Sequence, residues 1–438
     1  MSRRDVLKPF EENKAYMDDV INAGIERNRK GDVEITVKGS DGQPLKDIEI
    51  KVKQKTHEFK YGANIFMLDE LESPEKNELY KKYFAEAFNM ATIPFYWGDL
   101  EPEKGKPRYD KNSFKIYRRP PADLCLEFCE KNGIEPREHA LAYEHFFPDW
   151  LSQADVNECK KEYERRCREI AERYKDKINT IEVTNEMWWN EGKTALYKSD
   201  DFIEFCFNTA RKYFPDNQLV SNEWPCVWDE IGETTDKYFS YILDAINKGA
   251  MIDAIGFQYH MFFKADEEIQ KTARYYNPKH LYKIMDLYSQ FNMPLQLTEI
   301  TIPAYSNSEE DEAIQAEILK NLYSIWFSHE KVEQIIYWNL IDGYAAFANQ
   351  GDMSAGENYY YGGLIRFDLT PKPAYYMVKD LFQKVWHTEE VVCSNEEGTA
   401  SFRGFYGKYD VEITLNGKTI KKEIDFSKKS NGKFDIAI

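Results

Sequence analysis

The sequence predicts an α/β protein: a (β/α)8 barrel of the TIM type with a small β-sandwich built from the N- and C-terminal segments. Eight short apolar runs recur at intervals of about 30 to 45 residues, and helical stretches fill the gaps between them. At both ends of the chain this rhythm gives way to alternating apolar and polar residues, which is typical of half-buried strands. We therefore expect one large barrel and one smaller β-domain.

The N-terminal part predicts two elements that do not belong to the barrel. Residues 1–30 have apolar side chains at helical spacing and predict an amphipathic helix. Residues 31–58 contain two alternating stretches, 33–37 and 48–52, separated by a Gly- and Pro-containing turn sequence. This pattern predicts a β-hairpin, which is too small to be stable alone.

Residues 59–385 predict the barrel itself. Strands of such a barrel are buried on both faces and therefore form nearly continuous apolar runs. No Gly-rich phosphate loop follows the first run, which argues against a dinucleotide-binding sheet. The eight runs lie at residues 60–66, 89–97, 135–144, 178–187, 218–224, 251–260, 293–302 and 333–340.

The C-terminal part, residues 386–438, returns to alternation after a last predicted helix over 375–382. Asn416-Gly417 stands between two alternating stretches, and this dipeptide is a strong signal for a tight hairpin turn. We expect this segment to pair with residues 31–58 in a single accessory β-sandwich.

Composition and charge exclude several classes of protein. Lys and Arg number 58 against 76 Asp and Glu, so the net charge of −18 and the absence of a basic patch speak against nucleic-acid binding. No run approaches the roughly 20 apolar residues that span a bilayer, so we expect no membrane partner. The seven cysteines include Cys125 and Cys129 at helical spacing, which suits buried side chains better than disulfides. The charged N-terminus predicts a cytoplasmic protein, or a secreted one if a signal peptide has been removed.

Two carboxylates stand at predicted strand ends, where the active sites of such barrels form. Glu186 follows the fourth run, and Glu299 lies in the seventh. A lone Glu at a strand end is more often solvated or ion-paired. However, hydrolysis of a glycoside needs a protonated acid and an ionised carboxylate on opposite sides of the bond. Asn185, beside the first carboxylate, can hydrogen-bond a sugar hydroxyl.

Seven sequence blocks in matching order resemble glycoside hydrolase family 10, the xylanase-type retaining β-glycosidases of the Asn-Glu barrel clan. The resemblance covers roughly residues 60–385 and implies a (β/α)8 barrel. The blocks are Glu101-Pro102 with Gly105 and Tyr109; Arg137, His139 and Leu141 with Pro148-Asp149-Trp150; Val183–Glu186; Ile255–His260; Leu297–Ile300; Tyr337-Trp338 with Asp342; and Phe367-Asp368 with Pro371–Tyr375.

The resemblance implies a role for each site residue. Glu186 would be the general acid/base and Glu299 the nucleophile. Four residues would support them: His260 by bonding the nucleophile, Asn185 and Gln258 by holding the 2-hydroxyl region of the sugar, and His139 by contacting that sugar. The candidate substrate-binding residues are Trp338, Tyr143, Glu144, Trp97, Trp188 and Asn222.

The second strand departs from the family pattern, so the chain is a divergent member. The family carries Glu-Asn-Glu-Met-Lys-Trp there, whereas this chain has Thr92–Trp97 and lacks the Glu, Asn and Lys. The third-strand Trp and His are replaced by Tyr143 and Glu144, and an eighth-strand Trp by Ala346. The residues that bind the sugar on the non-reducing side in the family are therefore replaced in this chain.

Three hypotheses for function follow. The favoured one is a retaining endo-1,4-β-xylanase-like hydrolase that cleaves a xylan-type chain by double displacement. The second keeps this mechanism on a different or modified glycan or glycoconjugate, and the third is a non-catalytic carbohydrate-binding barrel. A metal hydrolase using His139, His145 and His260 lacks a metal-binding spacing, so we expect no metal and no cofactor. A carbohydrate is the expected partner, and the oligomeric state stays open.

Overall fold

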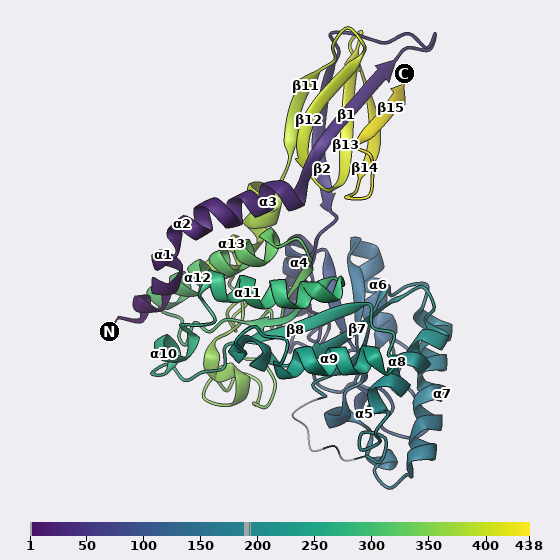
Figure 1. Cartoon of the computed structure of the whole chain (residues 1–438), viewed down its shortest axis with the longest axis vertical. Coiled ribbons are helices and arrows are strands. Elements are labelled where there is room, and N and C mark those ends of the chain that lie inside the picture. The colour runs from purple at the N-terminus through teal and green to yellow at the C-terminus, as the bar shows by residue number, and fades with distance from the viewer. Residues whose placement is uncertain (1, 188–191, 193) are drawn as a thin grey trace.

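The computed structural model describes residues 2–187, 192 and 194–438. It has two parts: a barrel surrounded by helices, and a β-sandwich that stands on one end of the barrel (Figure 1). The predicted fold class is confirmed.

Eight parallel strands form the barrel and close upon themselves, because β10 pairs with both β9 and β3. All residues of β4, β6 and β9 are buried, which explains the continuous apolar runs of the sequence. The strands are β3 (Lys60–Asn64), β4 (Met90–Pro94), β5 (Glu135–Ala142), β6 (Thr180–Asn185), β7 (Gln218–Glu223), β8 (Ala254–His260), β9 (Leu295–Thr301) and β10 (Val332–Tyr337).

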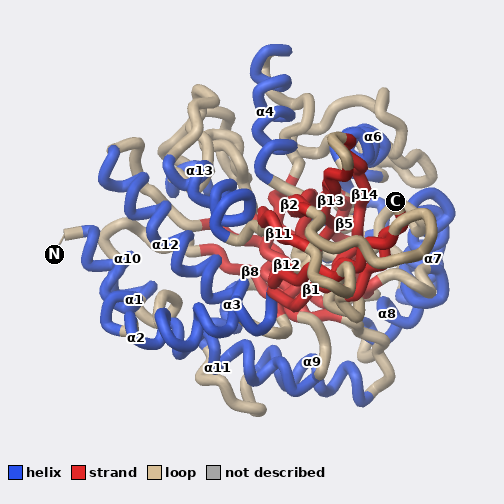
Figure 2. The backbone as a smooth tube through the Cα atoms, turned by 90° about the horizontal axis from the view of Figure 1, so that it is seen from above, coloured by secondary structure: helices blue, strands red, loops and turns tan. Residues whose placement is uncertain are grey.

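Helices surround these strands in the view along the molecule (Figure 2). Ser73, Asp155 and Ser308 each cap a helix by accepting a hydrogen bond from a backbone N–H of its first turn. None of the described helices is both long and apolar enough to cross a membrane. The helices of the barrel are α4 (Pro74–Ala87), α5 (Trp97–Leu100), α6 (Ala122–Asn132), α7 (Val156–Tyr174), α8 (Phe202–Tyr213), α9 (Lys237–Asn247), α10 (Glu268–Thr272), α11 (Pro278–Tyr288), α12 (Glu309–Ser328) and α13 (Pro373–Asp380).

The β-sandwich corrects the hairpin predicted for residues 31–58. The two N-terminal strands do not pair with each other. β1 lies in the sheet β12-β1-β15, and β2 lies in the sheet β11-β2-β13-β14. Placing them in opposite sheets lets their apolar faces meet in one core, which two paired strands alone could not enclose. The strands are β1 (Lys30–Lys38), β2 (Glu49–His57), β11 (Glu389–Cys393), β12 (Thr399–Phe405), β13 (Gly407–Leu415), β14 (Lys418–Phe426) and β15 (Lys433–Ala437).

The hairpin predicted at Asn416-Gly417 is confirmed. β13 and β14 pair antiparallel up to Leu415 and Lys418, so only these two residues form the turn. Both have a positive φ, 52° at Asn416 and 75° at Gly417, as a tight two-residue turn requires. The predicted state of Cys125 and Cys129 is confirmed as well, because both are free thiols buried on α6.

The N-terminal helical segment runs along the side of the barrel and leads into β1 (Figure 1). Its last helix ends at Arg29, whose guanidinium reaches the C-terminal end of α12. There it donates to the carbonyl oxygens of His329 and Val332, both at 2.6 Å, and to that of Phe327. The segment consists of η1 (Arg3–Leu7), α1 (Lys8–Glu12), α2 (Lys14–Tyr16), η2 (Met17–Ile21) and α3 (Asn22–Arg29).

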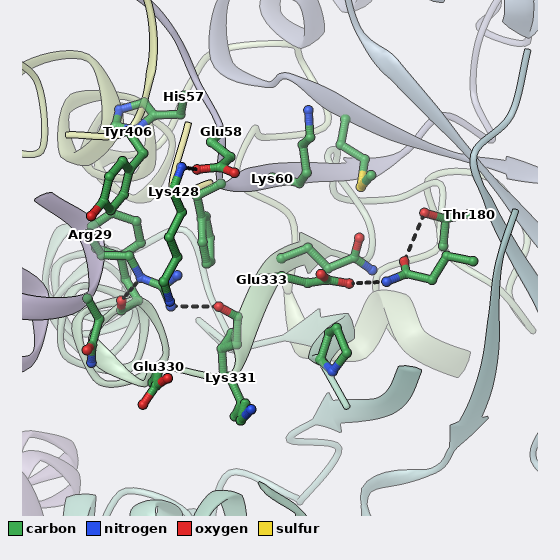
Figure 3. Close-up of a pocket in the computed structure, with 18 of the residues that line it drawn as sticks. Arg29, His57, Glu58, Lys60, Thr180, Glu330, Lys331, Glu333, Tyr406 and Lys428 are labelled. Carbon is green, nitrogen blue, oxygen red and sulfur yellow. Dashed lines mark hydrogen bonds between the residues drawn. The ribbon is translucent and has the colours of Figure 1, made fainter. Parts of the chain in front are cut away.

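A cavity of about 430 Å³ lies between the sandwich and the barrel (Figure 3). The first residues of several barrel strands line it on one side, and Tyr406 and Lys428 of the sandwich line it on the other. The backbone N–H of Lys428 donates to Glu58 at 2.8 Å and thereby joins the two parts. The sandwich therefore covers the amino-terminal end of the barrel, and the carboxyl-terminal ends of the strands lie at the opposite end.

We predict that Arg29→Met destabilises the protein by about 3 kcal/mol, because it leaves buried carbonyl groups without their donor. The free energy of unfolding in urea measures the effect. Arg27→Met is the matched control, because Arg27 is exposed on the same helix. Equal stability of the two variants would contradict the role given to Arg29.

Candidate active site

A cavity of about 380 Å³ lies at the carboxyl-terminal ends of the barrel strands. Glu186 follows β6 directly, and Glu299 lies near the end of β9. Because both residues stand at the carboxyl-terminal ends of barrel strands, both carboxylates line this cavity. Of the predicted residues, Asn185, His139, Tyr143, Gln258, His260 and Trp338 line it as well.

A single amide group joins the two carboxylates. Nε2 of Gln258 donates to Oε1 of Glu186 at 2.8 Å and to Oε1 of Glu299 at 3.1 Å. These two oxygens therefore lie no more than about 6 Å apart. This is less than the roughly 6.5–9.5 Å that leaves room for an attacking water between two carboxylates.

Glu186 is half-buried and has a left-handed backbone, with a φ of 53°. This conformation is uncommon for a residue other than glycine. The Tyr143 hydroxyl donates to Oε2 of Glu186 at 2.5 Å, while Gln258 holds the other oxygen. Both carboxylate oxygens are thus oriented by donors, one from the end of β5 and one from β8.

Glu299 is 3% exposed and surrounded by donors. Besides Gln258, its Oε1 accepts from Nδ2 of Asn222 at 3.2 Å, and its Oε2 lies 3.2 Å from Nε2 of His260. Burial raises the pKa of the Glu299 carboxyl well above its ordinary value, and the positive charge of His139 opposes this shift.

His260 is a neutral donor to Glu299. Burial lowers its pKa to about 4, so the ring carries one proton at neutral pH. Nδ1 lies 2.9 Å from the hydroxyl of Thr301, which can donate to it, and Nε2–H then points at Glu299. Thr301 thus selects the tautomer that serves the carboxylate.

A buried ion cluster lies beneath the two carboxylates. Glu182 pairs with Nη2 of Arg137 at 2.6 Å and with Nδ1 of His139 at 2.8 Å. Burial lowers the pKa of His139, but the attraction of Glu182 outweighs this effect, so the pKa is raised overall and the protonated ring is favoured. The other ring nitrogen then donates to the hydroxyl of Tyr96 at 2.9 Å. His139, Glu182 and Glu299 could offer ligand atoms to a cation, yet Arg137 already supplies positive charge there.

Three predicted substrate-binding residues do not line the cavity. Trp97 is buried and packs against the rings of Phe147 and Trp150. It is therefore a core residue, and the prediction that it contacts the substrate is corrected. Glu144 is buried and accepts from the backbone N–H of Thr194 at 2.7 Å. Asn222 lies one layer below and holds Asn185 and Glu299. Trp188 lies outside the described residues.

Several cavity residues were not predicted from the sequence. They lie in loops or at positions without a motif, so only the closed barrel brings them to one place. The residues Phe66, Tyr96, Arg118, Arg119, Phe146, Trp224, Phe262 and Glu357 belong to this group.

Comparisons with known proteins agree with the sequence blocks and this geometry. The profile of Glycosyl hydrolase family 10 matches residues 55–381, which is most of the chain. The chain belongs to this family.

Individual relatives are distant. The chain is 26% identical to the anti-sigma-I factor RsgI6 of Acetivibrio thermocellus, over 91% of this chain and 47% of that protein. It is 25% identical to endo-1,4-beta-xylanase 1 of Arabidopsis thaliana, over 90% of this chain and 38% of that protein. It therefore spans less than half the length of either relative. The crystal structure of xylanase 10B from Thermotoga maritima has the same fold, with a TM-score of 0.57 and 23% identity over 75% of this chain and 96% of that one.

We predict that Glu182→Gln destabilises the protein by about 3 to 5 kcal/mol, because it leaves the buried charge of Arg137 without its anion and removes the carboxylate that favours the protonated form of His139. Unfolding in urea measures the loss. The matched control is Glu172→Gln on α7, whose exposed partner Arg168 lies 3.9 Å away, and we expect it to cost less than about 1 kcal/mol. Losses of similar size in both variants would refute a structural role of the cluster.

Proposed function

We propose that the protein is a retaining β-glycoside hydrolase, endo-1,4-β-xylanase-like, in which Glu186 is the general acid/base and Glu299 the nucleophile. The observation that supports this most directly is the Gln258 amide that holds both carboxylates in one cavity. Their short separation favours a covalent intermediate over direct attack by water.

In the first step, the protonated Glu186 donates its proton to the glycosidic oxygen while an oxygen of Glu299 attacks the anomeric carbon. The bond between that carbon and the glycosidic oxygen breaks, the aglycone leaves as an alcohol, and a glycosyl ester forms on Glu299. In the second step, the Glu186 carboxylate removes a proton from water, and the water oxygen attacks the same carbon. The ester bond then breaks and releases Glu299.

The surroundings of the carboxylates suit this sequence. His260, Gln258 and Asn222 all donate to Glu299 and stabilise the negative charge that must be present before attack and that returns after ester hydrolysis. Trp338 lies at the wall of the cavity, 5.3 Å from the ring of His139 and 5.2 Å from that of Phe66. Its indole offers a sugar ring an apolar surface to pack on.

We expect the two carboxylates to respond differently to removal. Glu186→Gln should slow hydrolysis of xylo-oligosaccharides by about 10²- to 10⁴-fold, yet affect a nitrophenyl xyloside far less, because its leaving group needs little protonation. Glu299→Gln should abolish cleavage of both. Steady-state kinetics on both substrates measure this, and NMR of the first product should show the β-anomer. Activity of Glu299→Gln near that of the unmodified enzyme would rule out the proposed function.

The pH dependence should report the raised pKa of Glu299. The nucleophile must be ionised, so activity is lost as the pH falls through this pKa. The acidic limb of kcat/KM should therefore lie above pH 4.5, the ordinary value of a glutamic acid. In Glu186→Gln, measured on the nitrophenyl xyloside, the limb should stay close to its position in the unmodified enzyme, because the mechanism requires Glu186 to be protonated, and so without charge, when Glu299 loses its proton. Glu172→Gln should leave the limb in place, and a limb at or below pH 4.5 in the unmodified enzyme would contradict this electrostatic account.

A further inference from the structure

Two adjacent arginines, Arg118 and Arg119, line the cavity that holds the two carboxylates. They belong to the long loop between α5 and α6, and Arg118 has a positive φ of 62° that turns the chain at this point. The same two residues line a second cavity of about 480 Å³, which also shares Phe146 and Phe347 with the first. The arginines therefore stand where the active-site cavity continues into a neighbouring groove.

Arg118 is a buried cation whose direct hydrogen-bond partners are neutral. Its side chain donates to Oδ1 of Asn339 at 3.1 Å and to the carbonyl oxygen of Tyr344. No carboxylate of the described residues forms an ion pair with it; Glu357 reaches it only through Asn339, whose Nδ2 donates to Oε2 of Glu357 at 2.9 Å. A buried charge without a contacting counter-ion is costly, and an anionic ligand would supply one.

Arg119 is held in place with part of its guanidinium still available. Nε donates to Asp99 at 2.6 Å and Nη1 to the carbonyl oxygen of Arg118 at 3.0 Å. The guanidinium lies 4.2 Å from the ring centre of Tyr96 and 5.3 Å from that of Phe146. Within the described part of the chain, Nη2 has no hydrogen-bond acceptor. The group is thus oriented before a ligand arrives.

The aromatic residues around the arginines connect this site to the catalytic carboxylates. Tyr96, against which Arg119 packs, bonds His139 at 2.9 Å, and Phe66 lies between Arg118, at 5.7 Å, and the indole of Trp338, at 5.2 Å. A sugar unit on Trp338 would therefore have its neighbour, or a substituent, within reach of the guanidinium groups.

The sequence beside the arginines also indicates a ligand other than the neutral sugar of the family pattern. The segment Thr92–Trp97, which includes the end of β4, lacks the polar Glu, Asn and Lys with which the family pattern binds a neutral sugar. Arg118 and Arg119, which come from a different loop, line this side of the cavity, and Asp99 pairs with Arg119 only. In a chain with a net charge of −18, which repels anions overall, these guanidinium groups offer a negatively charged ligand a local counter-charge on this side of the cavity.

We propose that Arg118 and Arg119 bind the carboxylate of an acidic sugar, so that the preferred substrate is a β-1,4-linked chain carrying uronic acid units. The planar guanidinium matches a carboxylate through two parallel hydrogen bonds, which a neutral hydroxyl cannot accept in the same way. This inference rests on the proposed glycosidase function and specifies its substrate class.

The test compares three substrates of equal length: β-1,4-xylotetraose, the same chain with one glucuronic acid branch, and the methyl ester of that branched chain. The ester keeps the bulk of the branch and removes its charge. We expect kcat/KM for the acid to exceed that for the ester by at least tenfold in the unmodified enzyme. Equal values for acid and ester would overturn the proposal.

Variants locate the effect. In Arg119→Gln the ratio of acid to ester should fall at least tenfold, and Arg118→Lys, which keeps the charge but loses the planar fork, should reduce it by a smaller factor. Arg173→Gln on α7, an exposed arginine paired with Asp123, is the matched control and should leave the ratio unchanged. An unchanged ratio in both cavity variants, with thermal midpoints near that of the unmodified protein, would refute the role of the arginines.

A binding measurement separates the two proposals. Calorimetry with the Glu299→Gln protein should show tighter binding of the acid than of the ester, and this result does not depend on turnover. If none of the three substrates is hydrolysed by the unmodified enzyme but the acid still binds more tightly, the glycosidase proposal fails and the arginine site stands. If all are hydrolysed and bound alike, the arginine site fails and the glycosidase proposal stands.

Discussion

The Gln258 amide is the contact on which the site depends, because it places two acidic groups close together in a buried cavity. Two carboxylates at this distance repel each other, and burial alone would leave one of them protonated. The amide donates to both, and Asn222 and His260 add donors to Glu299 alone. This unequal distribution of donors is what can separate the two groups into the proposed acid and the proposed nucleophile.

Further charged groups are buried in the barrel below Glu186 and Glu299. The ring of His139 lies between the Glu182 carboxylate and the Tyr96 hydroxyl, and the positive charge of its protonated form opposes the rise in the pKa of Glu299. Arg137 balances the second oxygen of Glu182. These groups are buried on β5 and β6, so the rigidity of the parallel sheet fixes their distances. A loop could not hold them with the same accuracy.

At the amino-terminal end of the barrel, hydrogen bonds and aromatic contacts attach the N-terminal helical segment and the sandwich. Arg29 joins the N-terminal helical segment to the end of α12, and Glu58 connects the start of β3 to the sandwich. His57 packs against four aromatic rings there and, through Nε2, bonds the carbonyl oxygen of Phe382 at 3.0 Å. The sandwich is thus attached at the stable face of the barrel, away from the loops that form the cavity.

The sequence by itself determined the barrel, the positions of its eight strands and the placement of Glu186 and Glu299 at strand ends. These features follow from local patterns: apolar runs, turn residues and recognisable blocks. It did not determine the pairing of β1 and β2, because alternation shows which side of a strand is buried but not which strand lies beside it. Nor did it distinguish Trp97 in the core from Trp338 in the cavity, since both are aromatic residues at strand ends. Only the closure of the barrel brought Arg118 and Arg119 to the active-site cavity, because that contact depends on the path of a long loop through space and leaves no pattern along the chain.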